Sequence, residues 1–300
     1  MSDGRDCDNR RERAEAEFWY PMAMNSLDLQ VVIDLVLRKS GIVLDASKQY
    51  LVEARLGVIA KSSGLPSISA LVSQLRQPHG MVIERMIVDA MTTNETTFFR
   101  DVIPFDALKS VVLPEIISRR AAERSMAIWC AASSTGQEPY SLAMLMRDSF
   151  PQLAGWNITF IASDLSRDVL ARARAGRFSQ LEVNRGLPAA FLVKYFTKSG
   201  IDWEIRDEFK KMIDFREINL LEAWPAMPPL DLVLIRNVLI YFGNESKKQI
   251  LGKIGRVMHP AGYLFLGGSE STMNVDDSFE RVQVDKTGAY RRRARCGMAA

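Results

Sequence analysis

The segment from Trp129 to Met144, WCAASSTGQEPYSLAM, constrains the fold of this chain more than any other. Its pattern predicts a short buried strand, a turn of small residues and the first turns of a helix. Because the turn over 131–136 holds almost no bulky side chain, a ligand can approach its backbone. The helix that comes next presents free N–H groups and a partial positive charge. The segment therefore predicts a ligand site, with Glu138 either as a helix cap or as the partner of a cation.

Strand patterns and helix patterns alternate from Pro114 onward, as expected for a doubly wound α/β sheet with right-handed crossovers. The predicted strands are Met126–Ala131, Asn157–Ser163, Asp231–Ile235 and Gly262–Leu266. The predicted helices between them are Glu138–Asp148, Arg167–Ala175 and Glu245–Met258. Two further strand patterns without a helix between them, Phe279–Val284 and Gly288–Arg293, predict a hairpin at the edge of the sheet.

One interval, 178–216, interrupts the alternation. It contains a helix pattern around Ala189–Phe196 and two short polar strand patterns, near Trp203–Arg206 and Phe209–Phe215. We interpret the interval as an inserted antiparallel β-subdomain. Insertions of this kind usually serve the choice of partner or substrate, because surface loops tolerate them and a core does not.

The N-terminal third contains helix patterns only, beginning near Ser26, Ser47, Ser67 and Met81. These patterns predict a small all-α domain over 27–91. We expect a disordered tail over 1–26, a linker that serves as a cofactor lid over 92–115, the α/β domain over 116–293, and a C-terminal tail over 294–300.

Composition excludes several classes of protein. The 300 residues are 47% hydrophobic and carry a net charge of +3, which is too mild to indicate nucleic-acid binding. Three distant cysteines argue against disulfides, and the two histidines, His79 and His259, show no metal-ligand spacing, so we expect no metal site. The sequence contains neither a run of about 18 apolar residues that could cross a membrane nor a signal-peptide core. A cytoplasmic protein is expected.

Polar residues stand directly after the predicted strands, where ligands of open α/β sheets bind. Asp164 ends the second strand and is well placed for ribose hydroxyls, although it is equally suited to cap the next helix. Arg236 and Asn237 come directly after the apolar run DLVLI, and they can instead mark simple termination of that strand.

The turn after the first predicted strand lacks the glycines that dinucleotide and phosphate sites require. Gly136 is the only glycine there, so neither the G-x-G-x-x-G pattern of dinucleotide sites nor a phosphate-binding P-loop is present. A nucleoside without phosphates fits better, and S-adenosylmethionine is the common one. Methyltransferases that act on amino groups often carry an Asn/Asp-Pro-Pro-aromatic motif after the fourth strand. This chain has RNVLIYF there, which argues against methylation of a base or an amide.

A second polar and aromatic segment, TTNETTFFRD over 92–101, has neither helical nor strand periodicity. It can be a capped helix entry, with Asn94 or Thr93 as the cap and with Phe98 and Phe99 packing. The alternative is a lid over the cofactor, with Arg100 presenting a planar fork to a carboxylate.

Together these segments resemble the chemotaxis receptor glutamate methyltransferases, the CheR family. The motifs that carry the resemblance are TTNETTFFR (92–100), CAASSTGQEPYSLAM (130–144), ASDLS (162–166), NLL (219–221), RNVLIYF (236–242) and GGSES (267–271). The family combines an N-terminal helical domain with a Rossmann-like class I methyltransferase domain that carries a β-subdomain. This organisation agrees with the segmentation above.

The resemblance implies residues for the methionine end of S-adenosylmethionine. Asn94, Thr96 and Arg100 would contact this end of the cofactor, and Glu138 would hold its amino group. Gln137 departs from the pattern, because many family members have a glutamate there, but Glu138 retains the functional carboxylate.

The resemblance also implies residues for the nucleoside end. Asp164 would bind the ribose, and Asn219 with Leu220 would line the adenine. Arg236 and Asn237 would complete the pocket.

The implied reaction transfers a methyl group to glutamate carboxylates of membrane chemoreceptors and gives γ-glutamyl methyl esters and S-adenosylhomocysteine. A glutamate is already anionic at neutral pH, so no general base is required. Arg100 and Tyr241 are expected to orient the cofactor and the incoming carboxylate, and Tyr241 lies beside the expected point of methyl transfer.

The partner is expected to be the cytoplasmic domain of a methyl-accepting receptor. The protein itself is expected to be a monomer. Lys48 and Arg55, seven residues apart on the second predicted helix, are candidates for steering this acidic partner, although a solvated basic face explains them equally well. Because the inserted subdomain is short and contains one glycine between Phe196 and Phe215, Gly200, we expect no dependence on a receptor C-terminal pentapeptide. The alternatives are an inactive S-adenosylmethionine-binding regulator and a methyltransferase that acts on another substrate.

Overall fold

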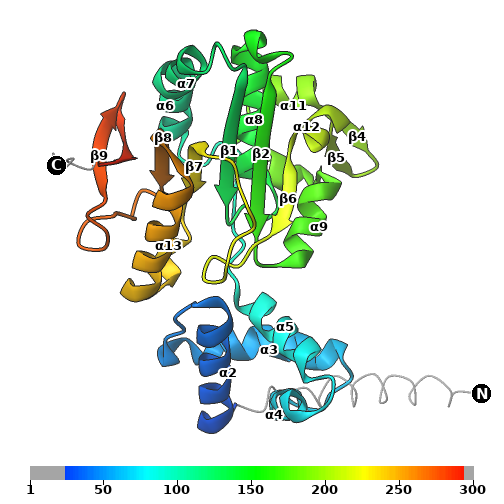
Figure 1. The fold of residues 1–300 in the computed structure, drawn as a ribbon. Helices are drawn as coiled ribbons and strands as arrows, with labels where there is room; N and C mark the ends of the chain where they lie inside the picture. The colour runs from blue at the N-terminus through cyan, green and yellow to red at the C-terminus, as the bar shows by residue number, and fades with distance from the viewer. Residues whose placement is uncertain (1–23, 294–300) are drawn as a thin grey trace, which may run out of the picture. The chain divides into compact units, whose positions relative to one another are not determined.

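A computed structural model describes residues 24–293, so most of the predicted N-terminal tail and all of the C-terminal tail lie outside the described residues. The chain divides into two compact units, one ending at Thr92 and the other beginning at Thr93. Figure 1 shows the first unit as helices only and the second as a sheet with helices around it.

The first unit is helical, as the sequence predicts. Its elements are α2 (Ser26–Ser40), η1 (Ala46–Lys48), α3 (Gln49–Ser62), α4 (Ile68–Ser73), η2 (Gln74–Arg76) and α5 (Gly80–Met91). The side chain of Asn25 caps the start of α2, and Gly41 ends it in the left-handed conformation that glycine adopts without strain. Buried aliphatic side chains such as Val32, Leu56 and Ile87 form the core of this unit.

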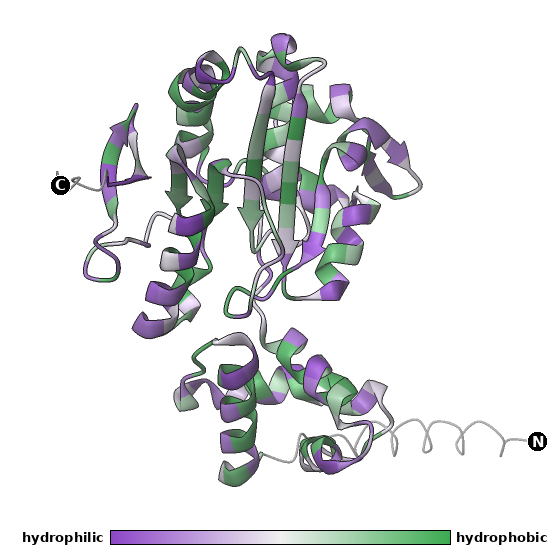
Figure 2. Cartoon of the chain, in the orientation of Figure 1, coloured by the Kyte–Doolittle hydropathy of each residue, from purple (hydrophilic) through white to green (hydrophobic). Residues whose placement is uncertain are grey.

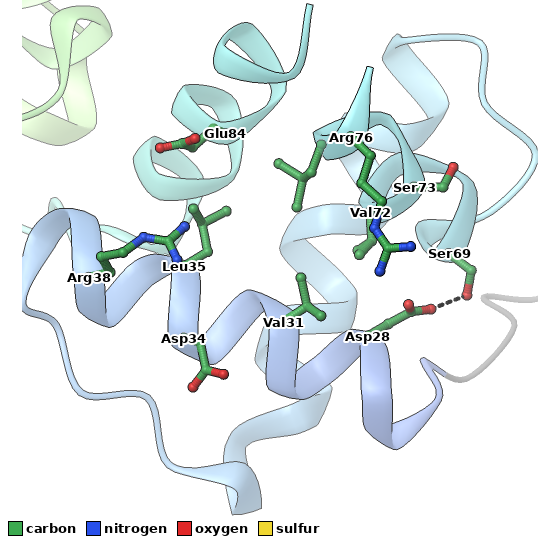
Figure 3. A pocket seen from close by; sticks show the side chains of 11 residues that line it. Asp28, Val31, Asp34, Leu35, Arg38, Ser69, Val72, Ser73, Arg76 and Glu84 are labelled. Carbon is green, nitrogen blue, oxygen red and sulfur yellow. Dashed lines mark hydrogen bonds between the residues drawn. The ribbon is translucent and has the colours of Figure 1, made fainter. Parts of the chain in front are cut away.

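A cavity of about 450 Å³ opens on this unit between α2, α4, η2 and α5. Figure 3 shows Asp28, bonded to the hydroxyl of Ser69, at one end of the cavity and Arg38 at the other. Aliphatic groups, including Val31 and Leu35, line it together with charged side chains of both signs. This mixed lining gives the cavity no preference for a ligand of one charge.

The second unit is built on a seven-stranded sheet with the order β6-β2-β1-β7-β8-β10-β9. Its strands are β1 (Ser125–Ala131), β2 (Asn157–Asp164), β6 (Asp214–Glu217), β7 (Leu230–Ile235), β8 (Met258–Leu266), β9 (Phe279–Val284) and β10 (Thr287–Arg292). The first five strands pair in parallel, whereas β10 is antiparallel to β8 and β9. This arrangement confirms the predicted α/β class, and β9 and β10 form the predicted edge hairpin.

Helices cover both faces of this sheet, so the central strands β1 and β7 are buried on both sides. Alternate residues of β1 face opposite cores: Ile128 and Cys130 pack in one cluster with α8 (Gln137–Ser149) and α9 (Arg167–Ala175), and Trp129 packs in the other with α13 (Asn244–Val257). Figure 2 shows much of the central strands in green and a mixture of purple and green along α13.

The inserted subdomain differs from the prediction at its second strand. Its own sheet has the order β3-β5-β4, from β3 (Arg177–Phe178), β4 (Phe196–Ser199) and β5 (Asp202–Ile205), with α10 (Gln180–Asn184) and α11 (Ala189–Tyr195) between β3 and β4. The strand predicted near Phe209–Phe215 is wrong. Residues Asp207–Met212 form helix α12, and β6 after it belongs to the main sheet, parallel to β2. The polar residues of this stretch are the exposed face of a helix and a short strand at the sheet edge.

The prediction of a linker through residue 115 is also wrong. Residues 102–119 form a continuous helical run of α6 (Val102–Ala107), the π-turn η3 (Leu108–Val112) and α7 (Leu113–Arg119). Phe105, Leu108 and Ile116 of this run are buried in the same cluster as Ile128 of β1. The run is therefore a packed layer of the α/β unit. Two short connecting turns, η4 (Pro151–Leu153) and η5 (Leu239–Tyr241), complete the elements.

Within residues 24–293, no helix combines the length and apolar character needed to cross a membrane.

Candidate functional site

The turn between β1 and α8 lies at the carboxyl edge of the parallel strands, and its backbone is unusual. Ala132, Ser134 and Gly136 have φ angles of 53°, 50° and 95°. A Cβ on Gly136 would lie 3.1 Å from the Cβ of Ala173 and from the ring of Tyr140, so glycine also allows α8 to pack closely on α9. Left-handed backbone at residues other than glycine is costly and is concentrated at functional sites. Phe99, Asp101 and Asn237 share this conformation.

Asp164 ends β2 beside this turn. Its two carboxylate oxygens accept the backbone N–H groups of Ser134, at 2.8 Å, and of Ser166, at 3.1 Å. Burial raises the pKa of this carboxyl, and the N–H groups of Ser166, Ser134 and Leu165 oppose the rise. Each carboxylate oxygen has a second lone pair, so the residue can still accept hydrogen bonds from a ligand's hydroxyls.

Glu138, at the start of α8, is paired with Arg236 from the end of β7. The Arg236 Nη1 atom donates to Glu138 Oε2 at 2.7 Å, and Nη2 donates to the Arg100 carbonyl at 3.0 Å and to Asp101 Oδ2 at 2.8 Å. The side chain of Arg236 is 1% exposed, that of Glu138 12% and that of Asp101 54%. Burial raises the pKa of Glu138, whereas the charge and hydrogen bond of Arg236 lower it. The structure thus brings the carboxyl ends of β1, β2 and β7 together with residues 100–101.

The 93–101 segment lies against this turn. The hydroxyl of Ser134 donates to the Asn94 carbonyl at 2.7 Å, and the N–H of Phe99 donates to the Ser141 hydroxyl at 2.9 Å. Arg100 is half-buried and donates to the Glu95 carbonyl at 3.1 Å, within its own segment. Thr96 is half-buried as well.

Phe98 and Phe99 anchor the segment. Phe98 is fully buried, and its ring meets those of Phe178 and Phe196 at centroid distances of 5.0 and 5.8 Å. Aromatic packing of this kind is the role that the helix-entry interpretation gave to these two residues. The caps that it named, Thr93 and Asn94, lie well before the start of α6 at Val102, and Asp101 directly before α6 makes no side-chain cap. Residues 93–101 are therefore a segment anchored by its aromatic side chains, with Glu95 paired to Arg185 and Asp101 paired to Arg236.

Asn219 and Leu220 come after β6 in a loop beside Asp164, whose carbonyl accepts the N–H of Ile218 at 3.0 Å. The carbonyl of Leu220 accepts from Lys253 Nζ of α13 at 2.5 Å. The Asn219 carbonyl accepts from Trp224 Nε1 at 3.2 Å. These bonds hold the loop over the sheet.

Sequence reasoning missed two residues of this edge. Asp101 pairs with Arg236, and the Glu270 carboxylate accepts the N–H groups of Asn237, at 2.8 Å, and of Gly267, at 2.6 Å. The sequence does carry a signal for Glu270, because GGSES stands directly after the predicted strand that ends at Leu266.

The edge also has unused polar capacity. Four buried side-chain N and O atoms lack a partner within the described residues, and two of them, Ser133 Oγ and Arg236 Nε, lie here. Buried polar groups are normally satisfied, so these atoms favour a polar ligand. Glu138 supplies a carboxylate, Arg236 a guanidinium, and Asp164 an acceptor for ribose hydroxyls, and the three lie at or after the ends of neighbouring strands. These residues fit a nucleoside that carries a zwitterionic amino-acid end.

Tyr241 ends the turn η5, which lies after Asn237 in the chain, and its side chain is half-buried. His259 lies at the start of β8, at the opposite edge of the sheet, where burial lowers its pKa. His79 belongs to the helical unit. Within the described part of the chain, no group of His, Cys, Asp and Glu side chains is arranged to hold a metal ion.

Comparison with known proteins agrees with this geometry. Residues 27–92 match the all-alpha domain of CheR methyltransferases, and residues 94–287 match their SAM-binding domain. The chain is 39% identical over 275 residues to chemotaxis protein methyltransferase 1 of Pseudomonas aeruginosa, covering 90% of this chain and 99% of that protein. It is 38% identical to chemotaxis protein methyltransferase Cher2 of Pseudomonas putida over 87% of this chain and 96% of that protein. Matches that cover both units at this identity show that the chain belongs to the CheR family of S-adenosylmethionine-dependent methyltransferases.

Proposed function

We propose that this protein transfers a methyl group from S-adenosylmethionine to glutamate side chains in the cytoplasmic domain of chemoreceptors, forming γ-glutamyl methyl esters. The names of its relatives, chemotaxis protein methyltransferases, support the chemoreceptor as substrate. The observation that carries the proposal is the buried Glu138–Arg236 pair, next to Asp164, at the carboxyl edge of the sheet. It offers both charges that a zwitterionic amino acid needs, beside an acceptor for ribose hydroxyls.

Each predicted residue has a part in this proposal. Asp164 binds the ribose hydroxyls, and Asn219 and Leu220 border the adenine. Glu138 accepts from the ammonium group, and Arg100 donates to the carboxylate, because a guanidinium fork binds a carboxylate at two points. Arg236, whose terminal nitrogens already bond to Glu138, Asp101 and the Arg100 carbonyl, completes the pocket. Asn94 and Thr96 close this end, and Asn237 supports the pocket wall. The remaining assigned residue, Tyr241, orients the acceptor.

The acceptor chemistry explains why the site needs no general base. When bound, S-adenosylmethionine supplies a methyl group on a positively charged sulfur. A glutamate carboxylate is anionic at neutral pH and attacks without losing a proton. Arg100 and Tyr241 need only align the two reactants and exclude water. The position of His259 at the far edge of the sheet is consistent with this mechanism.

The receptor-facing residues are proposed on the helical unit. Lys48 is exposed and free to meet an acidic partner. Arg55 donates to the carbonyls of Ala90 and Thr92 at 3.1 and 3.0 Å, so part of its role is to hold the end of α5. We also propose that the protein acts in the cytoplasm as a monomer. It needs no receptor pentapeptide, and tight calorimetric binding of an isolated NWETF-type peptide would contradict this.

The test uses the cofactor carrying a tritiated methyl group and membranes that contain chemoreceptors. We expect tritium on the receptor that mild base releases as methanol, because esters are base-labile. Arg100→Ala and Tyr241→Phe should reduce this signal. Base-stable label would indicate another acceptor, and cofactor binding without any label would indicate an inactive regulatory protein. Unchanged transfer in both variants would contradict their assigned roles.

A further inference from the structure

Glu270 joins two backbone segments at the carboxyl edge of the sheet. Its Oε2 atom accepts the N–H groups of Asn237, at 2.8 Å, and Gly267, at 2.6 Å, and Oε1 accepts the N–H of Ile240 at 3.2 Å. Two of these donors lie between β7 and the end of η5, the stretch that carries Tyr241. One carboxylate therefore satisfies three backbone donors from two segments that are about thirty residues apart in the sequence.

The backbone of the 237–240 stretch turns at Asn237. This residue has a φ of 58°, in the left-handed region that asparagine adopts more readily than most other residues. At Gly267, a Cβ would lie 2.8 Å from both nitrogens of Asn237, which shows how closely the two segments meet. Removal of the carboxylate would leave three N–H groups without their partner at this contact.

We propose that Glu270 is a positioning residue that locks the stretch from Asn237 to Tyr241, and so sets where Tyr241 meets the acceptor carboxylate. The consequence for Tyr241 rests on the proposed function. Arg236 is held separately, by Glu138, Asp101 and the Arg100 carbonyl. Of the residues proposed for the cofactor, Asn237 is bonded to Glu270, through its backbone N–H, whereas Glu138 and Asp164 are held by other partners. Loss of Glu270 should therefore disturb acceptor positioning more than cofactor affinity.

The first experiment measures hydrogen exchange at the amides of Asn237, Ile240 and Gly267. In Glu270→Ala, all three should exchange roughly tenfold faster, as expected when a hydrogen bond is lost. Glu270→Gln keeps one acceptor oxygen, so Ile240 should be affected most. Glu245→Gln is the matched control, because Glu245 is an exposed carboxylate at the start of α13. Exchange in Glu270→Ala equal to that of the control would overturn the proposal.

The second experiment compares S-adenosylhomocysteine affinity with the rate of methyl transfer. In Glu270→Gln, affinity should stay within about threefold of the wild type while kcat falls at least about tenfold, because misplacement of a reacting group is costly. An equal loss in affinity and kcat, or an unchanged kcat, would overturn the role in acceptor positioning. The exchange result needs no receptor, so failure of the proposed substrate would show separately, as absence of base-labile label with the wild-type protein.

Discussion

Gly186 brings the inserted subdomain into close contact with the backbone of the 93–101 segment. It lies between α10 and α11 with a φ of 87°, and a Cβ built on it would lie 2.0 Å from the backbone oxygen of Phe98. Because this oxygen belongs to the main chain, it cannot rotate away as a side chain would. Gly186→Ala must therefore move either the insert or the segment that carries Arg100.

Gly200 provides the matched control. It has a similar φ of 63° in the turn between β4 and β5, but a Cβ there meets nothing within 4 Å. Both alanine variants incur the left-handed penalty of about 1–2 kcal/mol. Only Gly186→Ala adds the clash, which costs about 1–3 kcal/mol by analogy with overpacked sites. We expect total losses of about 2–5 kcal/mol at Gly186 and about 1–2 kcal/mol at Gly200.

The assay is urea unfolding followed by tryptophan fluorescence, combined with calorimetry of S-adenosylhomocysteine. The free energy of unfolding should fall further in Gly186→Ala than in Gly200→Ala. Affinity should fall only in Gly186→Ala, because a shift of Phe98 disturbs the Phe99–Ser141 hydrogen bond beside the site. Equal destabilisation by the two variants would contradict this expectation, since the contact with the Phe98 oxygen is what distinguishes Gly186 from Gly200.

Three further predictions concern charged groups. Burial raises the pKa of Glu138, so this carboxylate takes up a proton at a higher pH than an ordinary glutamate does. As the pH falls, S-adenosylhomocysteine affinity measured by calorimetry should weaken over that higher range. The Glu138→Gln variant should not show this loss of affinity. Lys253→Met removes two hydrogen bonds to the 220–222 carbonyls and should weaken this binding roughly tenfold, while exposed Lys248→Met on the same helix should not. Asp231→Asn removes the buried charge that pairs with Arg119 and Arg120 and should lower the free energy of unfolding in urea by about 3–5 kcal/mol. S-adenosylhomocysteine affinity should be retained, because Asp231 lies at the amino end of β7.

The parts of the fold that can be predicted from sequence are those with strong local patterns. The predicted helix Arg167–Ala175 has the observed bounds, because Gly176 ends it with a left-handed φ of 60°. The strand ends at Asp164 and Ile235 were predictable because an apolar run stops at a polar residue. Parallel pairing then places those ends at one edge, so the meeting of Glu138 with Arg236 is a consequence of topology alone.

The parts that could not be predicted depend on tertiary packing. The run over 102–119 has Pro104 and Pro114 in it, which hide a helix whose buried side chains only make sense against β1. In residues 209–215, apolar and polar side chains alternate in part, which resembles a strand. The first part of this stretch is nevertheless helical and packs Phe209 into the core. Asp101 needed the three-dimensional position of Arg236, which sequence spacing does not provide.

The charges around Arg236 are balanced before any ligand arrives. Glu138, Arg236, Arg100 and Asp101 carry two charges of each sign, and the two other carboxylates of this edge, Asp164 and Glu270, accept backbone N–H groups. A zwitterionic methionine end adds no net charge to that set. Under the proposed reaction, the remaining charges are a sulfonium cation and an acceptor carboxylate, and methyl transfer removes both. Water stabilises those separate charges more than the neutral products, so a site from which water is excluded favours the transfer. Arg100 completes the set from a segment that aromatic packing anchors, and for this reason the Gly186 contact that positions the segment should matter for chemistry as well as for stability.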